Sequence, residues 1–164
     1  KELSLLTAPM TMPASLTQEK VRALLNEARP MYDYILIDSP AGLGAGFRLA
    51  ICGADRSLVV SVNDASSLRD AQRTVAELEH IQQVHLVMNR IQTRLLRKLR
   101  ATIDDAMDTA GLPLIGVVPE DPYVILCANL GQPLTTRGKK GAALACWNIA
   151  QRLEGNRIPI MRIR

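Results

Sequence analysis

Aromatic residues, paired cysteines and long apolar runs are all scarce in this sequence. Phenylalanine, tryptophan and tyrosine make up 3% of the 164 residues, so the chain has few of the rings on which proteins stack single-stranded nucleic acid. Three scattered cysteines and two histidines, with no C-x-x-C pair, argue against a structural zinc or iron–sulfur site. No apolar run approaches the ~20 residues of a membrane span. These absences predict a soluble, cytoplasmic protein with free thiols.

The residues that are abundant are aliphatic, and the hydrophobic fraction is 48%. They occur in short segments separated by polar residues, and the length fits one domain with a real core. A net charge of +4 is compatible with an acidic partner such as nucleic acid, or with simple solubility.

Aliphatic segments alternate with amphipathic ones along the chain. Runs at residues 3–6, 34–37, 57–62, 84–88 and 114–118 predict strands. Helical spacing predicts helices at about residues 15–28, 47–52, 64–79, 93–110, 122–129 and 139–153. This order predicts a doubly wound α/β fold, with a mostly parallel sheet covered by helices on both faces.

The stretch at residues 34–46 organises the rest of the chain, because an apolar run there ends on Asp38 and enters a loop of small residues. A continuous apolar run predicts a strand buried on both faces. Asp38 would then lie at the carboxyl end of that strand, where open α/β sheets bind their ligands. The alternative is an acid that caps a strand end before an ordinary turn.

Polar pairs follow four of the predicted strands. They are Asp38-Ser39, Asn63-Asp64, Asn89-Arg90 and Glu120-Asp121. An acid beside a small-residue loop suits a phosphate and its Mg²⁺ ion, and an asparagine amide suits a purine because it both donates and accepts. The alternative is structural: Asn89 would cap a strand end, and Glu120 and Asp121 would favour the N-terminus of the next helix.

Several motifs in register resemble the MinD/ParA family of deviant-Walker P-loop ATPases. They are YILIDSPAG at residues 34–42, NDASSLRDA at 63–71, VMNR at 87–90, GVVPED at 116–121 and ANLGQP at 128–133. The likeness covers residues 3–153 in the right order and is closest to the branch that places the bacterial division site. It implies a P-loop NTPase-like fold that binds ATP or ADP with magnesium.

The resemblance also implies a role for individual residues. Asp38 would position magnesium through water, as the catalytic acid. Ser39, Pro40, Ala41 and Gly42 would sense the γ-phosphate and change shape on hydrolysis. Asn89 would bind adenine, and the base would be enclosed by Arg90, Pro119, Glu120 and Asp121.

The chain departs from the family in one respect, because it has no G-x-x-x-x-G-K-S/T phosphate loop. The expectation is therefore that residues 1–155 are the C-terminal portion of one ATPase domain, incomplete at its N-terminus, and that residues 156–164 are a flexible basic tail. The full-length protein is expected to be an ATPase, and these 164 residues alone to be inactive.

The partners that the resemblance implies are a second copy, in a nucleotide-dependent homodimer, and division or partition regulatory proteins. Membrane contact, at the periphery of the inner membrane, is expected only with a longer C-terminus, because residues 158–164 are too short for an amphipathic helix. One alternative is a partition ATPase that binds DNA through the basic cluster Arg94, Arg97, Lys98 and Arg100. Another is a non-catalytic interaction module that keeps the ATPase scaffold.

Overall fold

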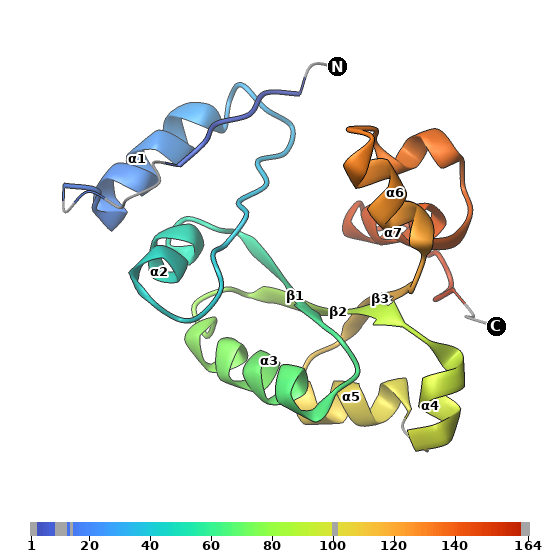
Figure 1. Cartoon of the computed structure of the whole chain (residues 1–164). Helices are drawn as coiled ribbons and strands as arrows, with labels where there is room; N and C mark the ends of the chain where they lie inside the picture. Colours follow the sequence, from blue (N-terminus) through green and yellow to red (C-terminus); the bar gives the residue numbers. More distant parts are fainter. Residues whose placement is uncertain (1–2, 9–12, 14, 100–101, 162–164) are drawn as a thin grey trace. The chain divides into compact units, whose positions relative to one another are not determined.

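The computed structural model in Figure 1 describes residues 3–8, 13, 15–99 and 102–161. The chain divides into two units, Lys1–Asp55 and Arg56–Arg164. Among the helices of the described residues, none has the length and apolar character needed to cross a bilayer.

The first unit contains two helices, α1 (Gln18–Ala28) and α2 (Ala45–Ile51). Thr17 caps α1 by accepting a hydrogen bond from the Lys20 N–H, as its position before the helix predicts. Arg29 follows α1 and donates two hydrogen bonds to the carboxylate of Asp55, at 2.7 and 2.9 Å. This fork links the end of α1 to the chain that follows α2.

Two predicted strands of the first unit are wrong. Residues 3–6 and 34–37 have no regular secondary structure, and their aliphatic side chains are exposed, with Leu36 at 90%. The apolar pattern reports a preference for burial, but a strand also requires a neighbouring strand for its N–H and C=O groups. Among the described residues, neither run is a strand of the sheet.

The second unit is built on a parallel sheet of β1 (Arg56–Ser61), β2 (Gln83–Ile91) and β3 (Leu114–Pro119), in the order β1-β2-β3. Helices α3 (Ala65–Glu77) and α5 (Ile103–Ala110) lie on one face, and α7 (Gly141–Leu153) lies on the other, as Figure 1 shows. This arrangement confirms the predicted doubly wound α/β fold.

The core between α7 and the sheet is made of small and branched residues. Val87, Ile115, Ala145 and Ile149 are buried together there. Gly116 on β3 lets α7 approach closely, because a Cβ at this position would lie 2.2 Å from Cγ1 of Ile149. A methyl group would therefore push the helix away from the sheet.

The single helix predicted over residues 93–110 is wrong, because the structure has two helices there, α4 (Thr93–Leu99) and α5. Thr102 begins α5 with a capping box: its hydroxyl accepts from the Asp105 N–H, and the Asp105 carboxylate accepts from the Thr102 N–H. This motif starts a new helix inside a pattern that remains apolar at helical spacing. Arg100 lies outside the described residues.

Helix α6 (Pro122–Asn129) follows β3, has the predicted bounds and begins with proline in its first turn, where the fixed φ and missing N–H of proline are tolerated. A short 3-10 helix, η1 (Leu134–Arg137), joins α6 to α7. Beyond α7, Arg152 donates hydrogen bonds to the carbonyl oxygens of Ile115, Ile158 and Pro159. Residues 158–159 are therefore tied to β3 through one guanidinium group, and the predicted flexibility of the tail stays a prediction.

Candidate functional site

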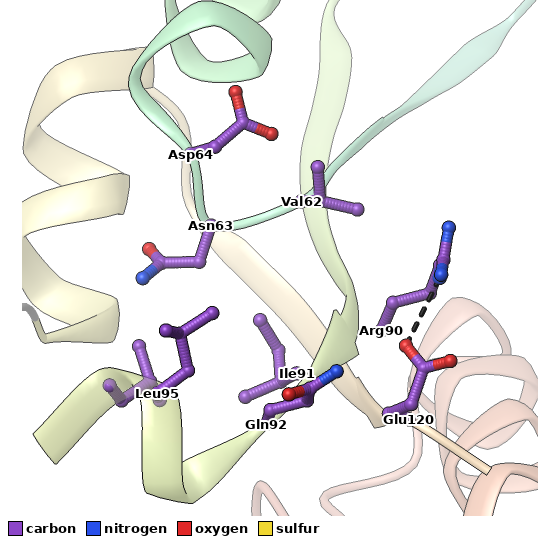
Figure 2. Close-up of a pocket in the computed structure, with 9 residues that line it drawn as sticks. Val62, Asn63, Asp64, Arg90, Ile91, Gln92, Leu95 and Glu120 are labelled. Carbon is purple, nitrogen blue, oxygen red and sulfur yellow. Dashed lines mark hydrogen bonds and ion pairs between the residues drawn. The ribbon is translucent and has the colours of Figure 1, made fainter. Parts of the chain in front are cut away.

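A pocket of about 200 Å³ opens at the carboxyl edge of the parallel sheet in the second unit. Its walls come from the chain after β1, the end of β2, the start of α4 and the residue after β3. The lining residues are Val62, Asn63, Asp64, Arg90, Ile91, Gln92, Leu95, Leu96 and Glu120. Figure 2 shows Asn63 and Leu95 on one side of this pocket, and Arg90 with Glu120 on the other.

The position of the pocket follows from the parallel register of the strands. Ser61 at the end of β1 pairs with Met88, and Ile91 at the end of β2 pairs with Pro119. The carboxyl ends of parallel strands meet at the same edge, so the polar residues after each strand converge there. The structure thus brings together three of the four polar pairs identified in the sequence.

Asp64 is the N-cap of α3 and borders the pocket. Its carboxylate accepts hydrogen bonds from the N–H groups of Ser66 and Ser67, at 3.0 and 2.9 Å, and from both hydroxyls, at 2.6 and 2.9 Å. These bonds, the Ser66 hydroxyl first, lower the pKa of Asp64 to about 2. The group is therefore a fixed anion near neutral pH, committed to the start of α3.

Arg90 adopts a backbone conformation that is unusual for a residue with a side chain, with φ of 53°. Its N–H donates to Oδ1 of Asn89 at 2.9 Å, and its Nε donates to Oε2 of Glu120 at 3.0 Å. The Glu120 N–H continues the sheet by donating to the carbonyl of Ile91 at 3.0 Å. Asn89, Arg90 and Glu120 therefore form one connected polar cluster at the sheet edge.

Asp121 has a structural role at this edge. Oδ1 accepts from the N–H of Tyr123 in α6, and Oδ2 accepts from the N–H of Ala142 in α7, each at 3.0 Å. Glycine at position 141, with φ of 50°, leaves space for this carboxylate. Asp121 thus follows the alternative reading of the sequence, in which it favours the start of the next helix, and it does so for two helices, α6 and α7.

The predicted switch residues Asp38, Ser39, Pro40, Ala41 and Gly42 lie in the first unit, in an exposed segment without helix or strand. The Ser39 hydroxyl donates to the Pro40 carbonyl at 3.3 Å, and Gly42 has φ of 81°, a value that favours glycine. Their role in a site stays a prediction.

The sequence did not indicate the part of the pocket wall formed by Leu95 and Leu96 on α4, which are apolar, and by Gln92 before the helix. The short connection between β2 and α4 could have indicated these residues, because α4 begins two residues after β2 ends. Such a short connection places the first turn of a helix beside the strand ends. Polar residues at strand ends indicate a binding site because their chemistry is distinctive. Leucines at helical spacing are typical of a buried core and do not by themselves indicate a pocket.

Among the described residues, no group of three or more His, Cys, Asp or Glu side chains could hold a metal ion by itself. A magnesium ion that travels with a nucleotide takes most of its ligands from phosphates and water, and needs one or two carboxylates from the protein. One exposed carboxylate such as Asp38 fits that requirement.

Comparison with known proteins decides the family. The chain is 35% identical over 151 residues to the septum site-determining protein MinD of Synechocystis sp., which covers 90% of this chain and 57% of the relative. It is 34% identical over 160 residues to MinD of Bacillus subtilis, covering 91% and 60%. The chain belongs to the MinD/ParA family. No family model matches it.

Solved structures agree with membership of the MinD/ParA family. The chain superposes on MinD in the MinC:MinD cell division protein complex of Aquifex aeolicus with a TM-score of 0.85 and 33% identity, covering 91% of this chain and 63% of that one. It matches the MinD of Pyrococcus horikoshii, solved in complex with Mg-ADP, with a TM-score of 0.72 at 24% identity, covering 84% and 57%, which shows the fold alone. The chain spans about 60% of the length of its curated MinD relatives.

Proposed function

We propose that this chain is the base-binding and switch portion of an ATP-dependent protein that places the division site. One observation carries the proposal: Asn89, Arg90 and Glu120 form a connected cluster beside a pocket at the carboxyl edge of the sheet. This cluster occurs in a chain about 35% identical to MinD proteins. The resemblance to the family suggests an adenine nucleotide as the ligand, and the cluster contains hydrogen-bonding groups that suit its base.

The proposed base contact is the side-chain amide of Asn89. An amide donates and accepts in one plane and so matches the edge of adenine. The hydrogen bond from the Arg90 N–H to Oδ1 orients that amide. Arg90 and Glu120, joined at 3.0 Å, would form a wall of the base site together with Pro119, while Asp121 would hold this edge to α6 and α7.

The family resemblance also supports a phosphate-binding role for Asp38 and the loop that follows it. Asp38 would hold the waters of a magnesium ion, which supplies charge neutralisation for the phosphates when it is bound. The exposed loop of Ser39, Pro40, Ala41 and Gly42 would follow the presence of the γ-phosphate, because small residues let backbone N–H groups approach an anion. ATP hydrolysis would release this loop, as in other nucleotide switches.

The proposal also requires a G-x-x-x-x-G-K-S/T loop upstream in the full-length protein, because phosphates need that cradle. We therefore expect the 164-residue chain alone to bind Mg-ATP more weakly than micromolar. Calorimetric titration of the chain with Mg-ATP measures this directly. Submicromolar affinity would contradict the proposal that the phosphate loop is required.

Partners are proposed by analogy with the relatives. MinD of Aquifex aeolicus was solved in a complex with MinC, so we propose a division regulator as partner of the full-length protein, and a homodimer formed when nucleotide is bound. Peripheral association with the inner membrane is proposed only for a form with a longer C-terminus.

The enzymatic part of the proposal is tested by substitution of Asp38. In the full-length protein, Asp38→Asn should lower kcat for ATP hydrolysis by about a hundredfold or more, with the urea unfolding midpoint unchanged. Asp108→Asn, on the exposed side of α5, is the matched control and should leave kcat unchanged. Equal activity of Asp38→Asn and the control would show that Asp38 has no part in catalysis.

A partition function is the second candidate, because Arg94, Arg97 and Lys98 are all exposed on α4. Such a cluster would hold the DNA backbone without sequence preference, with an affinity that falls steeply as salt rises. DNA retention by the full-length protein that disappears in Arg94→Glu with Arg97→Glu would favour partition over division. Absence of ATP hydrolysis by the wild-type full-length protein would instead favour the non-catalytic module.

A further inference from the structure

One side of α1 faces the chain that follows α2, within the first unit. Arg22, Leu25 and Arg29 are spaced i, i+3 and i+7, so their side chains lie along one side of the helix. Nε of Arg22 donates to the carbonyl oxygen of Cys52 at 2.9 Å, and Nη2 of Arg29 donates to the carbonyl oxygen of Gly53 at 3.1 Å. Both guanidinium groups therefore bind the backbone at the C-terminal end of α2.

Gly53 brings the two segments into close contact. A Cβ at this position would lie 2.5 Å from Cδ1 of Leu25, so the backbone after α2 approaches α1 more closely than a residue with a side chain allows. The thiol of Cys52 donates to the carbonyl oxygen of Gln18, the first residue of α1, at 3.7 Å. The contact therefore extends along the whole of α1, from Gln18 to Arg29.

The two arginines bind groups that suit a cation. Cys52 is the C-cap of α2, and the last carbonyl oxygens of a helix have no N–H partner within it and carry the negative end of its dipole. Arg29 is oriented in turn by Asp55, whose carboxylate accepts from Nη1 at 2.7 Å and from Nη2 at 2.9 Å. Such a planar fork is directional, so it fixes where the Arg29 guanidinium lies.

The other end of α2 adjoins residues 38–44, which we call the switch segment. Arg48 in α2 donates from its backbone N–H to the Gly44 carbonyl at 3.2 Å, and from Nη1 to the Leu43 carbonyl at 3.3 Å. The last two residues of the switch segment are therefore bound to α2. Because α2 is a single short helix of seven residues, whatever fixes its C-terminal end also fixes where the switch segment ends.

We infer that Arg22 and Arg29 are positioning residues for the switch segment: they hold α2 against α1, so that the segment ends at a fixed point while residues 38–42 change conformation with the nucleotide. This inference rests on the proposed nucleotide function and adds α1 as the support of the switch. A small displacement of a group that acts on a reacting phosphate can cost about a hundredfold in rate. Loss of the support should therefore lower kcat.

Hydrogen exchange in the full-length protein without nucleotide tests whether the arginines hold α2. In the double variant Arg22→Ala with Arg29→Ala, the amides of residues 48–51 should exchange about fivefold faster than in wild type, because α2 loses two charged partners. Lys20→Ala is the matched control, because Lys20 is exposed on α1 but lies two residues from Arg22 and so on another side. Equal exchange in the double variant and the control would overturn the inference, whatever the ATPase result.

ATP hydrolysis by the same variants separates positioning from packing. The double variant should have a kcat about tenfold below that of wild type, with KM for ATP unchanged and the urea unfolding midpoint nearly unchanged, because exposed ion pairs contribute little to stability. Lysine at both positions keeps the charge without the fork and should give an intermediate kcat. An unchanged kcat in the double variant, in a protein whose hydrolysis is lost in Asp38→Asn, would overturn the inference alone. Absence of hydrolysis in wild type would overturn the proposed function, and the exchange rates would still decide whether the arginines hold α2.

Discussion

Asp121 and Ala142 are joined by a hydrogen bond of 3.0 Å from the Ala142 N–H to Oδ2, while Oδ1 of the same carboxylate accepts from the Tyr123 N–H. One side chain therefore caps two helices, α6 and α7. Because a single cap contributes about 1 kcal/mol, Asp121→Ala should lower the free energy of unfolding by about 2 kcal/mol. Urea denaturation followed by circular dichroism measures the change.

Thr102→Ala is the control for the Asp121 substitution, because Thr102 caps α5 alone. Its expected cost is about 1 kcal/mol. If Asp121→Ala costs no more than Thr102→Ala, the carboxylate does not stabilise both helices at once, and the account of this edge of the sheet is wrong.

The close approach of α7 to β3 at Gly116 gives a second prediction. Gly116→Ala places a methyl group against Cγ1 and Cδ1 of Ile149, and overpacking of this kind costs about 1–3 kcal/mol. In an Ile149→Ala background the space is free, so the same substitution should cost at least about 1 kcal/mol less. A double-mutant cycle of urea unfolding gives the coupling, and additive costs would show that the two residues do not touch.

The backbone of Arg90 gives a third prediction, because its φ of 53° is unfavourable for a residue with a Cβ. Arg90→Gly and Arg90→Ala both remove the exposed ion pair with Glu120, which contributes little to stability by itself. Only the alanine retains the backbone cost, so the glycine variant should be more stable by about 1 kcal/mol. Equal unfolding midpoints for the two variants would contradict the left-handed conformation.

The decrease in the free energy of unfolding at acidic pH should depend in part on Asp64. Its pKa in the folded protein is about 2, below the ordinary value of 3.8, so the folded state keeps the carboxylate ionised where the unfolded chain takes up a proton. The contribution is complete above the ordinary pKa and is lost as the pH falls through about 2. The stability advantage of wild type over Asp64→Asn should therefore shrink across that range.

Ser66→Ala provides the check on the cause of the Asp64 shift, because the Ser66 hydroxyl makes the largest contribution to it. In this variant the carboxyl titration of Asp64, followed by NMR, should move to higher pH. An unchanged titration would mean that the hydroxyl bond at 2.6 Å does not hold the carboxylate.

The second unit was largely predictable because its local signals agree with one another. Asp64 before a helix, Pro122 at a first turn and Gly111 in the left-handed conformation at the end of α5 all lie where sequence rules place them. Short strands that alternate with helices form a parallel sheet, and in a parallel sheet the strand ends that carry Asn89 and Glu120 lie at the same edge.

The failures have two physical causes. Residues 34–37 show that a run of aliphatic residues does not form a strand unless another strand accepts its hydrogen bonds, and pairing is a long-range property. Residues 93–110 show that a local capping box at Thr102 interrupts an apolar period that continues through it. The positions of Arg137 over the Tyr123 ring and of Lys139 over the Trp147 ring depend on tertiary contacts, so the sequence alone did not indicate these pairs.

The central claim is that the sheet edge at Asn89 recognises the base of a nucleotide, and competition between ATP and GTP in the full-length protein tests it most directly. We expect wild type to prefer ATP, and Asn89→Ala to weaken ATP binding by about tenfold and to reduce that preference, while Asn129→Ala on α6 binds like wild type. Unchanged affinity and preference in Asn89→Ala would contradict the account.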